Sequence, residues 1–300
     1  MCLTSSARAA PTISAAAFAP DGKSVVVGSQ AGIEVHSWPE LRSLRKLTTK
    51  LAHIHDLTFS PAGDVLAAAG GAPAEEGAIE LFRWPSGELL KRVSEHTDLV
   101  YAVAWRGDGR RFATASADGT CRVRDAATGK CAQIFKGHSR PVLAIAWTPD
   151  GKQVLSAGID QSLRLWDAET GRQVRAMENH TGPVHGLALR PQAGTDAPPL
   201  FASAGGDRTV RLWQPTIGRM VRFKRLPSAV LVVAWDREGR RLLAGCAGGR
   251  LRIIDPDTLE MVQDEVAVRG WLHTLAVPPR GDELLAGGEQ GQLKRVRLSR

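Results

Sequence analysis

Short apolar runs recur along the whole chain, and each is closed by a turn that carries Pro, Asp or Gly. One such run and turn forms a phrase that occurs seven times, in steps of 41 to 46 residues. These seven anchors are FAPDG, FSPAG, WRGDG, WTPDG, LRPQAG, WDREG and VPPRG, which begin at residues 18, 59, 105, 147, 189, 235 and 277. Self-similarity with this period indicates a repeat architecture rather than one or two large cores.

Within each unit apolar and polar positions alternate, as at Leu163, Arg164 and Leu165, and a period of two predicts β-strands. Four such runs in a unit predict a four-stranded antiparallel meander, whose strands we call a, b, c and d in chain order. A sheet of this kind is apolar on both faces, so it must stack on its neighbours. Seven stacked sheets predict an all-β protein in which the sheets close into a ring and leave few exposed edges.

Two segments, SAGIDQSLRLWD at Ser156–Asp167 and SAGGDRTVRLWQ at Ser203–Gln214, resemble the WD40-repeat family. The resemblance implies a seven-bladed β-propeller that spans residues 1–300 as one domain. It also implies a hydrogen-bonded tetrad in a blade, formed by a His before strand a, a Ser or Thr on strand b, an Asp in the b–c turn and a Trp on strand c. The positions that match are His138, Ser156, Asp160 and Trp166 in the fourth unit, His180, Ser203, Asp207 and Trp213 in the fifth, and His96, Thr114 and Asp118 in the third.

Four units depart from the tetrad, and the third has Arg124 where Trp is expected. Phe82 and Ile254 occupy the Trp position in the second and sixth units, while Trp38 and Trp84 fall two places after it. We expect apolar stacking between sheets to hold these blades together. The tetrad histidines have a structural task, which argues against a catalytic one.

The seventh unit ends after strand c, at Gln292–Ser299, so its outer strand must come from elsewhere. The resemblance implies that the N-terminal segment, residues 2–8 around Cys2–Ala7, supplies this strand and pins the two ends together. As an alternative, the chain is a piece of a longer polypeptide.

Composition places the chain among folded proteins, because 43% of its residues are hydrophobic and 23% are charged. No apolar run reaches the roughly 18 residues that a membrane span needs, so we expect a soluble protein. The cysteines are dispersed, with no CxxC motif, which is typical of reduced thiols in the cytoplasm. They are Cys2, Cys121, Cys131 and Cys246.

Motifs for catalysis and for cofactor binding are missing from the chain. There is no GxGxxG between a strand and a helix, and GxSxG, HExxH and EF-hand spacings are absent. The string AATGK at Ala126–Lys130 ends like a phosphate-binding loop, but Cys131 follows in place of Ser or Thr. We therefore predict no catalytic residue, no cofactor and no metal.

One position on strand a, four residues before each anchor, is rich in His. It reads Ser14, His55, Tyr101, Leu143, His185, Leu231 and His273. Strand a is the innermost strand of a propeller blade, so these residues should form a ring at one mouth of the central channel. We expect His55, Tyr101, His185 and His273, with Arg140, to contact a partner protein. The alternatives are a metal-dependent enzyme that uses the three histidines, and solvated channel residues without a special role.

The net charge of +8 is locally uneven. A basic patch lies on and near strand d of the fifth unit, and it consists of Arg208, Arg219, Arg222, Lys224 and Arg225. A patch of this kind could bind an anionic polymer such as nucleic acid, but aromatic residues are scarce in it, so we keep nucleic-acid binding as an alternative and do not expect it. A charged edge that discourages strand pairing is the other interpretation.

The two longest insertions point to opposite faces of the expected ring. Gly70–Gly77 lies in a b–c loop and Arg190–Pro199 in an a–b loop. We interpret the chain as a non-catalytic protein-interaction scaffold or targeting module and expect a monomeric ring in the cytoplasm. We expect the partner on the face that carries the d–a and b–c loops, because recognition concentrates in loops on a rigid scaffold.

Overall fold

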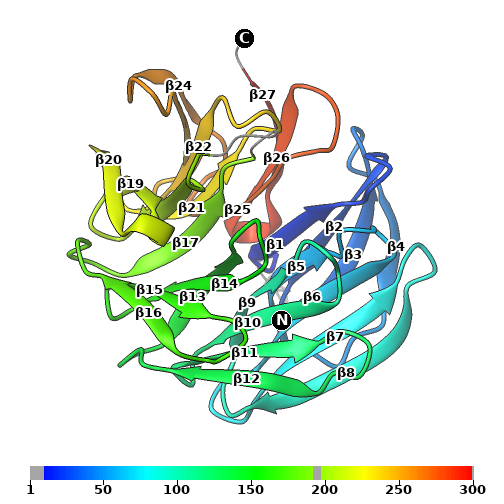
Figure 1. The fold of residues 1–300 in the computed structure, drawn as a ribbon. Coiled ribbons are helices and arrows are strands. Elements are labelled where there is room, and N and C mark those ends of the chain that lie inside the picture. Colours follow the sequence, from blue (N-terminus) through cyan, green and yellow to red (C-terminus); the bar gives the residue numbers. More distant parts are fainter. Residues whose placement is uncertain (1–9, 192–196, 299–300) are drawn as a thin grey trace, which may run out of the picture.

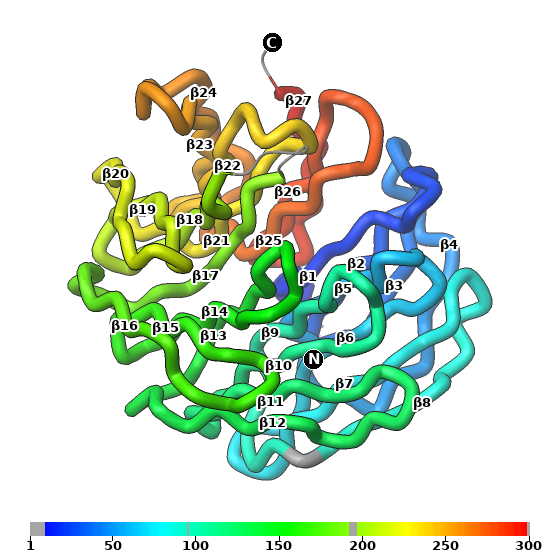
Figure 2. Tube along the Cα trace, in the orientation of Figure 1, coloured from blue at the N-terminus to red at the C-terminus, as the bar shows by residue number. Residues whose placement is uncertain are grey.

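The computed structural model describes residues 10–191 and 197–298. These residues form seven antiparallel sheets arranged around a central axis (Figures 1 and 2). Within the described ranges six sheets have four strands, and the seventh, which is last in the chain, has three. The all-β, seven-bladed propeller predicted from the repeat is therefore confirmed.

The strands of the first four blades follow one another in chain order. Blade 1 contains β1 (Ile13–Phe18), β2 (Ser24–Ser29), β3 (Gly32–Ser37) and β4 (Ser43–Leu47). Blade 2 contains β5 (His53–Phe59), β6 (Val65–Ala72), β7 (Glu76–Arg83) and β8 (Glu88–His96). Blade 3 contains β9 (Val100–Trp105), β10 (Arg111–Ser116), β11 (Thr120–Asp125) and β12 (Cys131–Lys136). Blade 4 contains β13 (Val142–Trp147), β14 (Gln153–Gly158), β15 (Leu163–Asp167) and β16 (Gln173–Met177).

The remaining blades repeat this order. Blade 5 contains β17 (Val184–Leu189), β18 (Phe201–Gly205), β19 (Thr209–Gln214) and β20 (Arg219–Arg225). Blade 6 contains β21 (Val230–Trp235), β22 (Leu242–Cys246), β23 (Arg250–Ile254) and β24 (Met261–Val266). Blade 7 contains β25 (Leu272–Ala276), β26 (Glu283–Gly288) and β27 (Leu293–Arg297). Two short 3-10 turns, η1 (Pro215–Ile217) and η2 (Glu289–Gly291), are added. No helix in the described residues is long and apolar enough to cross a membrane.

The hydrophobic core is distributed between neighbouring blades. One cluster joins Val26 and Ile33 of blade 1 to Ile54 and Leu66 of blade 2, and all four are buried. Burial of one such side chain stabilises the fold by about 1.5–3 kcal/mol. Because each sheet is covered by the next, the repeat pattern translates directly into the ring.

Blades 7 and 1 also pack against each other. Val25 of blade 1 lies in one buried cluster with Ala276 and Leu285 of blade 7, and Phe18 packs against that cluster. Side-chain packing therefore connects the last blade to the first. The N-terminal strand that the resemblance implies, residues 2–8, lies outside the described residues.

The strand-c positions follow the alignment made from the sequence. Phe82 is opposite Leu66, as Trp166 is opposite Val154 in blade 4, and Ile254 has the same place opposite Leu242. Trp38 and Trp84 come directly after β3 and β7. The ring of Trp38 packs edge-on against Phe18 at 4.8 Å between centroids, so it supports the anchor instead of a tetrad.

The insertion Gly70–Gly77 is not a loop, contrary to the prediction. β6 and β7 continue through it as a hairpin, with Gly71 opposite Gly77 and Ala72 opposite Glu76. The glycines allow this extension, since a Cβ at Gly71, where φ is +141°, would lie 2.1 Å from the carbonyl oxygen of Glu76. Part of the other predicted insertion, Arg190–Pro199, lies outside the described residues.

Candidate functional site

The tetrad residues of blades 4 and 5 are brought together in the same arrangement. In blade 5, His180 Nδ1 lies 2.9 Å from Asp207 Oδ2, and His180 Nε2 lies 2.7 Å from the hydroxyl of Ser203. The indole N–H of Trp213 donates to the same hydroxyl at 2.8 Å. The corresponding distances in blade 4, for His138, Ser156, Asp160 and Trp166, are 2.9, 2.7 and 2.8 Å.

Blade 3 contains the first three members of the tetrad and a different fourth one. His96 Nδ1 lies 2.7 Å from Asp118 Oδ2, and Nε2 lies 2.8 Å from the Thr114 hydroxyl. Arg124 stands at the Trp position and is only 1% exposed. Its Nη1 donates to the carbonyl oxygen of Gly129 at 3.2 Å. The guanidinium therefore reaches the c–d turn of blade 3.

Blade 2 uses a different link, which sequence reasoning missed. The carboxylate of Glu80 is fully buried and accepts hydrogen bonds from the Thr49 hydroxyl at 2.7 Å and the Lys50 N–H at 3.1 Å. It therefore connects strand c of blade 2 to the loop that enters the blade from blade 1. A charged residue at this strand position occurs in every unit, so the sequence alone did not single out Glu80.

The His-rich ring lies where the sequence placed it, and the backbone explains why. In every blade the pairing of strand a with strand b has a register shift at the ring residue, for example between Ile54 and Asp56 around His55. A β-bulge of this kind re-aims one side chain. The same shift surrounds the other ring residues, which are Ser14, Tyr101, Leu143, His185, Leu231 and His273.

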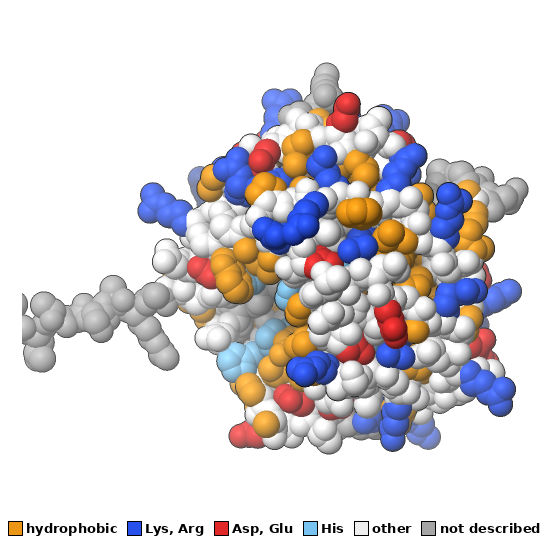
Figure 3. Space-filling model, turned by 90° about the vertical axis from the view of Figure 1, so that its left-hand side faces the viewer, with side chains coloured by type: hydrophobic (Ala, Val, Ile, Leu, Met, Phe, Trp, Pro, Cys, Tyr) orange, Lys and Arg blue, Asp and Glu red, His pale blue; other side chains and the backbone are white. Residues whose placement is uncertain are grey.

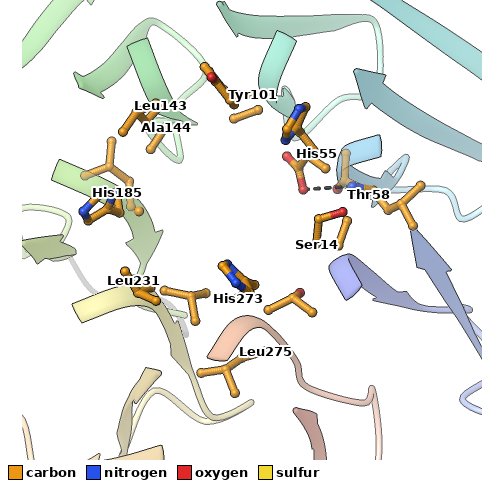
Figure 4. Close-up of a pocket in the computed structure, with 18 of the residues that line it drawn as sticks. Ser14, His55, Thr58, Tyr101, Leu143, Ala144, His185, Leu231, His273 and Leu275 are labelled. Carbon is orange, nitrogen blue, oxygen red and sulfur yellow. Dashed lines mark hydrogen bonds between the residues drawn. The ribbon is translucent and has the colours of Figure 1, made fainter. Parts of the chain in front are cut away.

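All seven ring residues line one cavity of about 370 Å³ on the central axis. Figure 4 shows them around the opening, with His55 and His185 on opposite sides and His273 between them and nearer the lower edge. The ring of His55 packs edge-on against Tyr101, with centroids 4.9 Å apart. The cavity is therefore a polar, partly aromatic mouth.

The three ring histidines do not converge on one point. They come from blades 2, 5 and 7, and among the described residues no group of three His, Cys, Asp or Glu side chains is placed to hold a metal ion. Burial, followed by the nearby His53, lowers the pKa of His55 to about 4. Burial also lowers the pKa values of His185 and His273. These shifts favour the neutral form of all three imidazoles at neutral pH.

Asp56 also lines the channel cavity, and the sequence analysis did not identify it. Its Oδ2 accepts the Val103 N–H and its Oδ1 the Leu57 N–H, both at 2.9 Å. Burial outweighs these two hydrogen bonds and raises the pKa of Asp56 to about 6. The signal was available, because no other unit has an acid at this position, where the residues are Ala15, Ala102, Ala144, Gly186, Val232 and Thr274.

Two exposed side chains lie outside the cavity on the same face. Trp271, just before β25, is 51% exposed, and its ring lies 6.1 Å from that of His273. Arg140, just before β13, is exposed and does not line the cavity. The partner-contact residues predicted from the sequence therefore separate into four at the channel mouth and one farther out.

The basic residues of blade 5 do not form one free surface. Arg222 donates to the carbonyl oxygens of Pro256 and Asp257, and Lys224 to that of Leu259, all in blade 6. Arg208, Arg219 and Arg225 are exposed. Figure 3, which faces the side of the ring that carries β20, shows Lys and Arg side chains spread widely with acidic ones between them. This distribution does not favour an anionic-polymer groove.

We expect the protein to lose stability as the pH falls from 7 towards 5. Burial lowers the pKa values of six histidines in the folded protein, so the unfolded chain takes up protons first in this range. They are His55, His96, His138, His180, His185 and His273. Asp56 acts in the opposite direction, because its raised pKa lets the folded protein take up a proton first.

The measurement is the midpoint of urea unfolding at about pH 7.5, 6.5 and 5.5, which should decrease in that order. A further loss is expected below about pH 4. Burial alone would raise the pKa values of Asp118 and Asp207, but hydrogen bonds and the His partners outweigh it and hold both below the usual range. A midpoint that stays constant or rises with acidity would contradict the expected proton balance.

Seven radial sheets with a polar axial mouth define the class of β-propellers. Residues 129–167 and 171–214 match the family model described as WD domain, G-beta repeat. Residues 57–143 match the Anaphase-promoting complex subunit 4 WD40 domain. The chain belongs to the WD40-repeat family, whose members are usually non-catalytic and bind protein partners.

Several proteins are similar to parts of this chain. Eukaryotic translation initiation factor 3 subunit I of Dictyostelium discoideum is 30% identical over 37% of this chain and 34% of its own length. Serine-threonine kinase receptor-associated protein of Rattus norvegicus is 26% identical over 42% of this chain and 34% of its own length. Intraflagellar transport protein 122 homolog of Mus musculus is 40% identical over 22% of this chain and 5% of its own length. The chain thus spans about a third or less of these relatives.

Proposed function

We propose that residues 1–300 act as one monomeric, non-catalytic interaction module in the cytoplasm, which docks a partner protein on the face that carries the d–a and b–c loops. The observation that supports this most is the channel mouth, where the bulged strands turn His55, Tyr101, His185 and His273 into one cavity. A cytoplasmic location agrees with the free thiols of Cys121, Cys131 and Cys246.

The side chains on this face have the composition of a protein interface. The exposed Trp271 offers a large flat contact beside the cavity, and Arg140 adds a flexible cation at its periphery. Trp, Tyr and Arg are enriched among residues that carry binding energy, especially next to pockets that exclude water. Burial lowers the pKa values of the three histidines and so favours their neutral form, which lets a partner cover these imidazoles without desolvating three cations.

The names of two relatives agree with an interaction role. One is named as a subunit of a translation initiation factor and another as a protein associated with a serine-threonine kinase receptor. The alignments cover only part of each relative, so the proposal takes from them the general role of binding and no particular partner.

The experiment compares matched variants in affinity purification from the native host. Trp271→Ala and Arg140→Glu should each reduce recovery of the main partner at least about fivefold, as expected for loss of one strong contact. Lys152→Glu is the control, because Lys152 is exposed in the a–b turn of the same blade as Arg140 but on the opposite face. Equal recovery by all three variants would place the partner elsewhere and contradict the proposal.

A further inference from the structure

Arginine side chains cover tryptophans at the junctions between blades, on the face that carries the a–b and c–d turns. Arg106 directly follows Trp105, the first residue of the anchor in blade 3. Its guanidinium carbon lies 6.0 Å from the ring centroid of Trp147, the first residue of the anchor in blade 4. Arg190 has the same place after the anchor of blade 5, 5.4 Å from the ring of Trp235. The chain therefore repeats one arrangement, a guanidinium over the next anchor.

At two further junctions between blades, an arginine and a tryptophan make the same contact from other positions. Arg45 of β4 lies 5.3 Å from the ring of Trp84 in blade 2, and Arg295 of β27 lies 5.7 Å from the ring of Trp38 in blade 1. Four tryptophans at blade junctions are thus covered by arginine. A cation over an indole face is stabilising, more so where water is excluded.

Among the tryptophans that begin an anchor, Trp105 of blade 3 is the one that no arginine covers within the described residues. The residue that follows the preceding anchor is Ser60 and not Arg, and its hydroxyl donates to Asp64 at 2.7 Å. A cavity of about 540 Å³ lies at this place between blades 2 and 3, with Trp105 in its wall. The indole N–H of Trp105 is itself buried, so a ligand in this groove meets the ring and not that donor.

The glycine in the a–b turn of blade 3 likewise has no arginine over it, unlike the equivalent glycines of blades 4 and 6. A Cβ on Gly151 would lie 3.0 Å from Arg106, and one on Gly239 would lie 3.0 Å from Arg190, because each arginine runs over a turn glycine. At Gly109, which also lines the cavity, the nearest atom would be on Pro61, at 3.7 Å. The groove beside Trp105 therefore has the open space that an arginine side chain fills in the two equivalent places.

Two acidic side chains, Asp64 and Asp108, and two basic ones, Lys91 and Arg110, line this groove. The residue five places after the anchor is basic in four blades, at Lys23, Arg110, Lys152 and Arg240, but it is Asp64 here. Asp64 is exposed at the wall of the cavity. Lys91 and Arg110 also line it, but the ammonium group of Lys91 donates to the carbonyl oxygen of Ala127. Asp64 is thus placed to pair with an incoming guanidinium.

We propose that the groove between blades 2 and 3 binds an arginine side chain presented by a partner protein. The guanidinium stacks on Trp105 and pairs with Asp64, while the methylene groups pack on Leu81 and Leu90 at the cavity wall. The groove opens on the face opposite the channel mouth, so this inference does not depend on the docking face proposed above.

The direct test uses N-acetyl-arginine amide as a probe of the full chain labelled with ¹⁵N. The eight tryptophans give eight indole N–H signals, and Trp105→Phe identifies the one from Trp105. The probe should shift that signal saturably, and N-acetyl-lysine amide should bind at least about threefold more weakly, since an ammonium stacks less well than a guanidinium. An unmoved Trp105 signal, or equal shifts with the lysine and leucine analogues, would overturn the proposal.

Three variants test the same logic from the protein side. Ser60→Arg supplies the guanidinium in the chain itself, so it should abolish the shift. Asp64→Lys, at an exposed site, should also abolish the shift and serves if Ser60→Arg does not fold. Arg106→Ser should create a second responsive site, and the Trp147 signal should then move with the arginine probe. Retained Trp105 shifts in Asp64→Lys would contradict the assignment.

Discussion

Replacing Trp213 with alanine is expected to lower the free energy of unfolding by about 3–5 kcal/mol, the range for removal of a buried aromatic side chain. The ring of Trp213 is 1% exposed and packs with Phe201 in the apolar cluster shared by blades 4 and 5. Its N–H also donates to Ser203, which in turn contacts His180. The substitution therefore leaves a cavity and removes one partner of a buried hydroxyl.

Urea unfolding followed by circular dichroism measures this loss, and two variants divide it into parts. Trp213→Phe keeps most of the ring volume but removes the N–H, so it should cost less than Trp213→Ala. Trp271→Ala removes a side chain that is 51% exposed and should change the free energy by no more than about 0.5 kcal/mol. Equal losses at Trp213 and Trp271 would mean that the buried cluster does not carry the stability assigned to it.

Asp207→Asn is expected to lower the free energy of unfolding by about 3 kcal/mol, as for a broken buried pair. The carboxylate side chain is 3% exposed. Its Oδ2 lies 2.9 Å from His180 Nδ1 and 3.3 Å from Arg211 Nη2, and its Oδ1 accepts hydrogen bonds from Thr209. An amide of the same size has only one acceptor oxygen, so some of these donors lose their partner.

The matched control for this change is Asp257→Asn. The Asp257 side chain is 76% exposed and lies 3.7 Å from Arg190, and exposed pairs of this kind contribute about 0–1 kcal/mol. Unfolding of both variants at neutral pH and low salt gives the comparison. If Asp207→Asn unfolds at the same urea concentration as the control, the His180–Asp207 pair is not a stabilising link between the loop before β17 and the b–c turn of blade 5.

The ring and its register could be predicted from the sequence because both repeat. The anchors fixed strand a in each unit, so the residue four places earlier had to share one level in every blade, and His55, His185 and His273 do share a cavity. The Phe82 and Ile254 positions followed from the same alignment. Any feature that depends only on the position inside a unit could therefore be predicted from the sequence.

Contacts between blades could not be predicted in this way. They depend on which way a side chain turns across a junction, as for Arg222 and Lys224, which reach carbonyl oxygens of blade 6. The buried Glu80 bonds to residues that belong to another unit, so no pattern within one unit identifies its partners. The raised pKa of Asp56 likewise comes from its desolvation in the folded ring, a quantity that strand periodicity does not contain.

The position of the tetrads affects local unfolding. Complete tetrads occupy blades 4 and 5 and the His–Thr–Asp part of one occupies blade 3, whereas the junction closed by Val25, Ala276 and Leu285 lies across the ring from blade 4. Regions with fewer buried cross-links open at lower free energy and exchange their amide hydrogens faster. We therefore expect amide hydrogens to exchange most slowly in blades 3–5. Local opening should be fastest at the junction where the first and last blades meet.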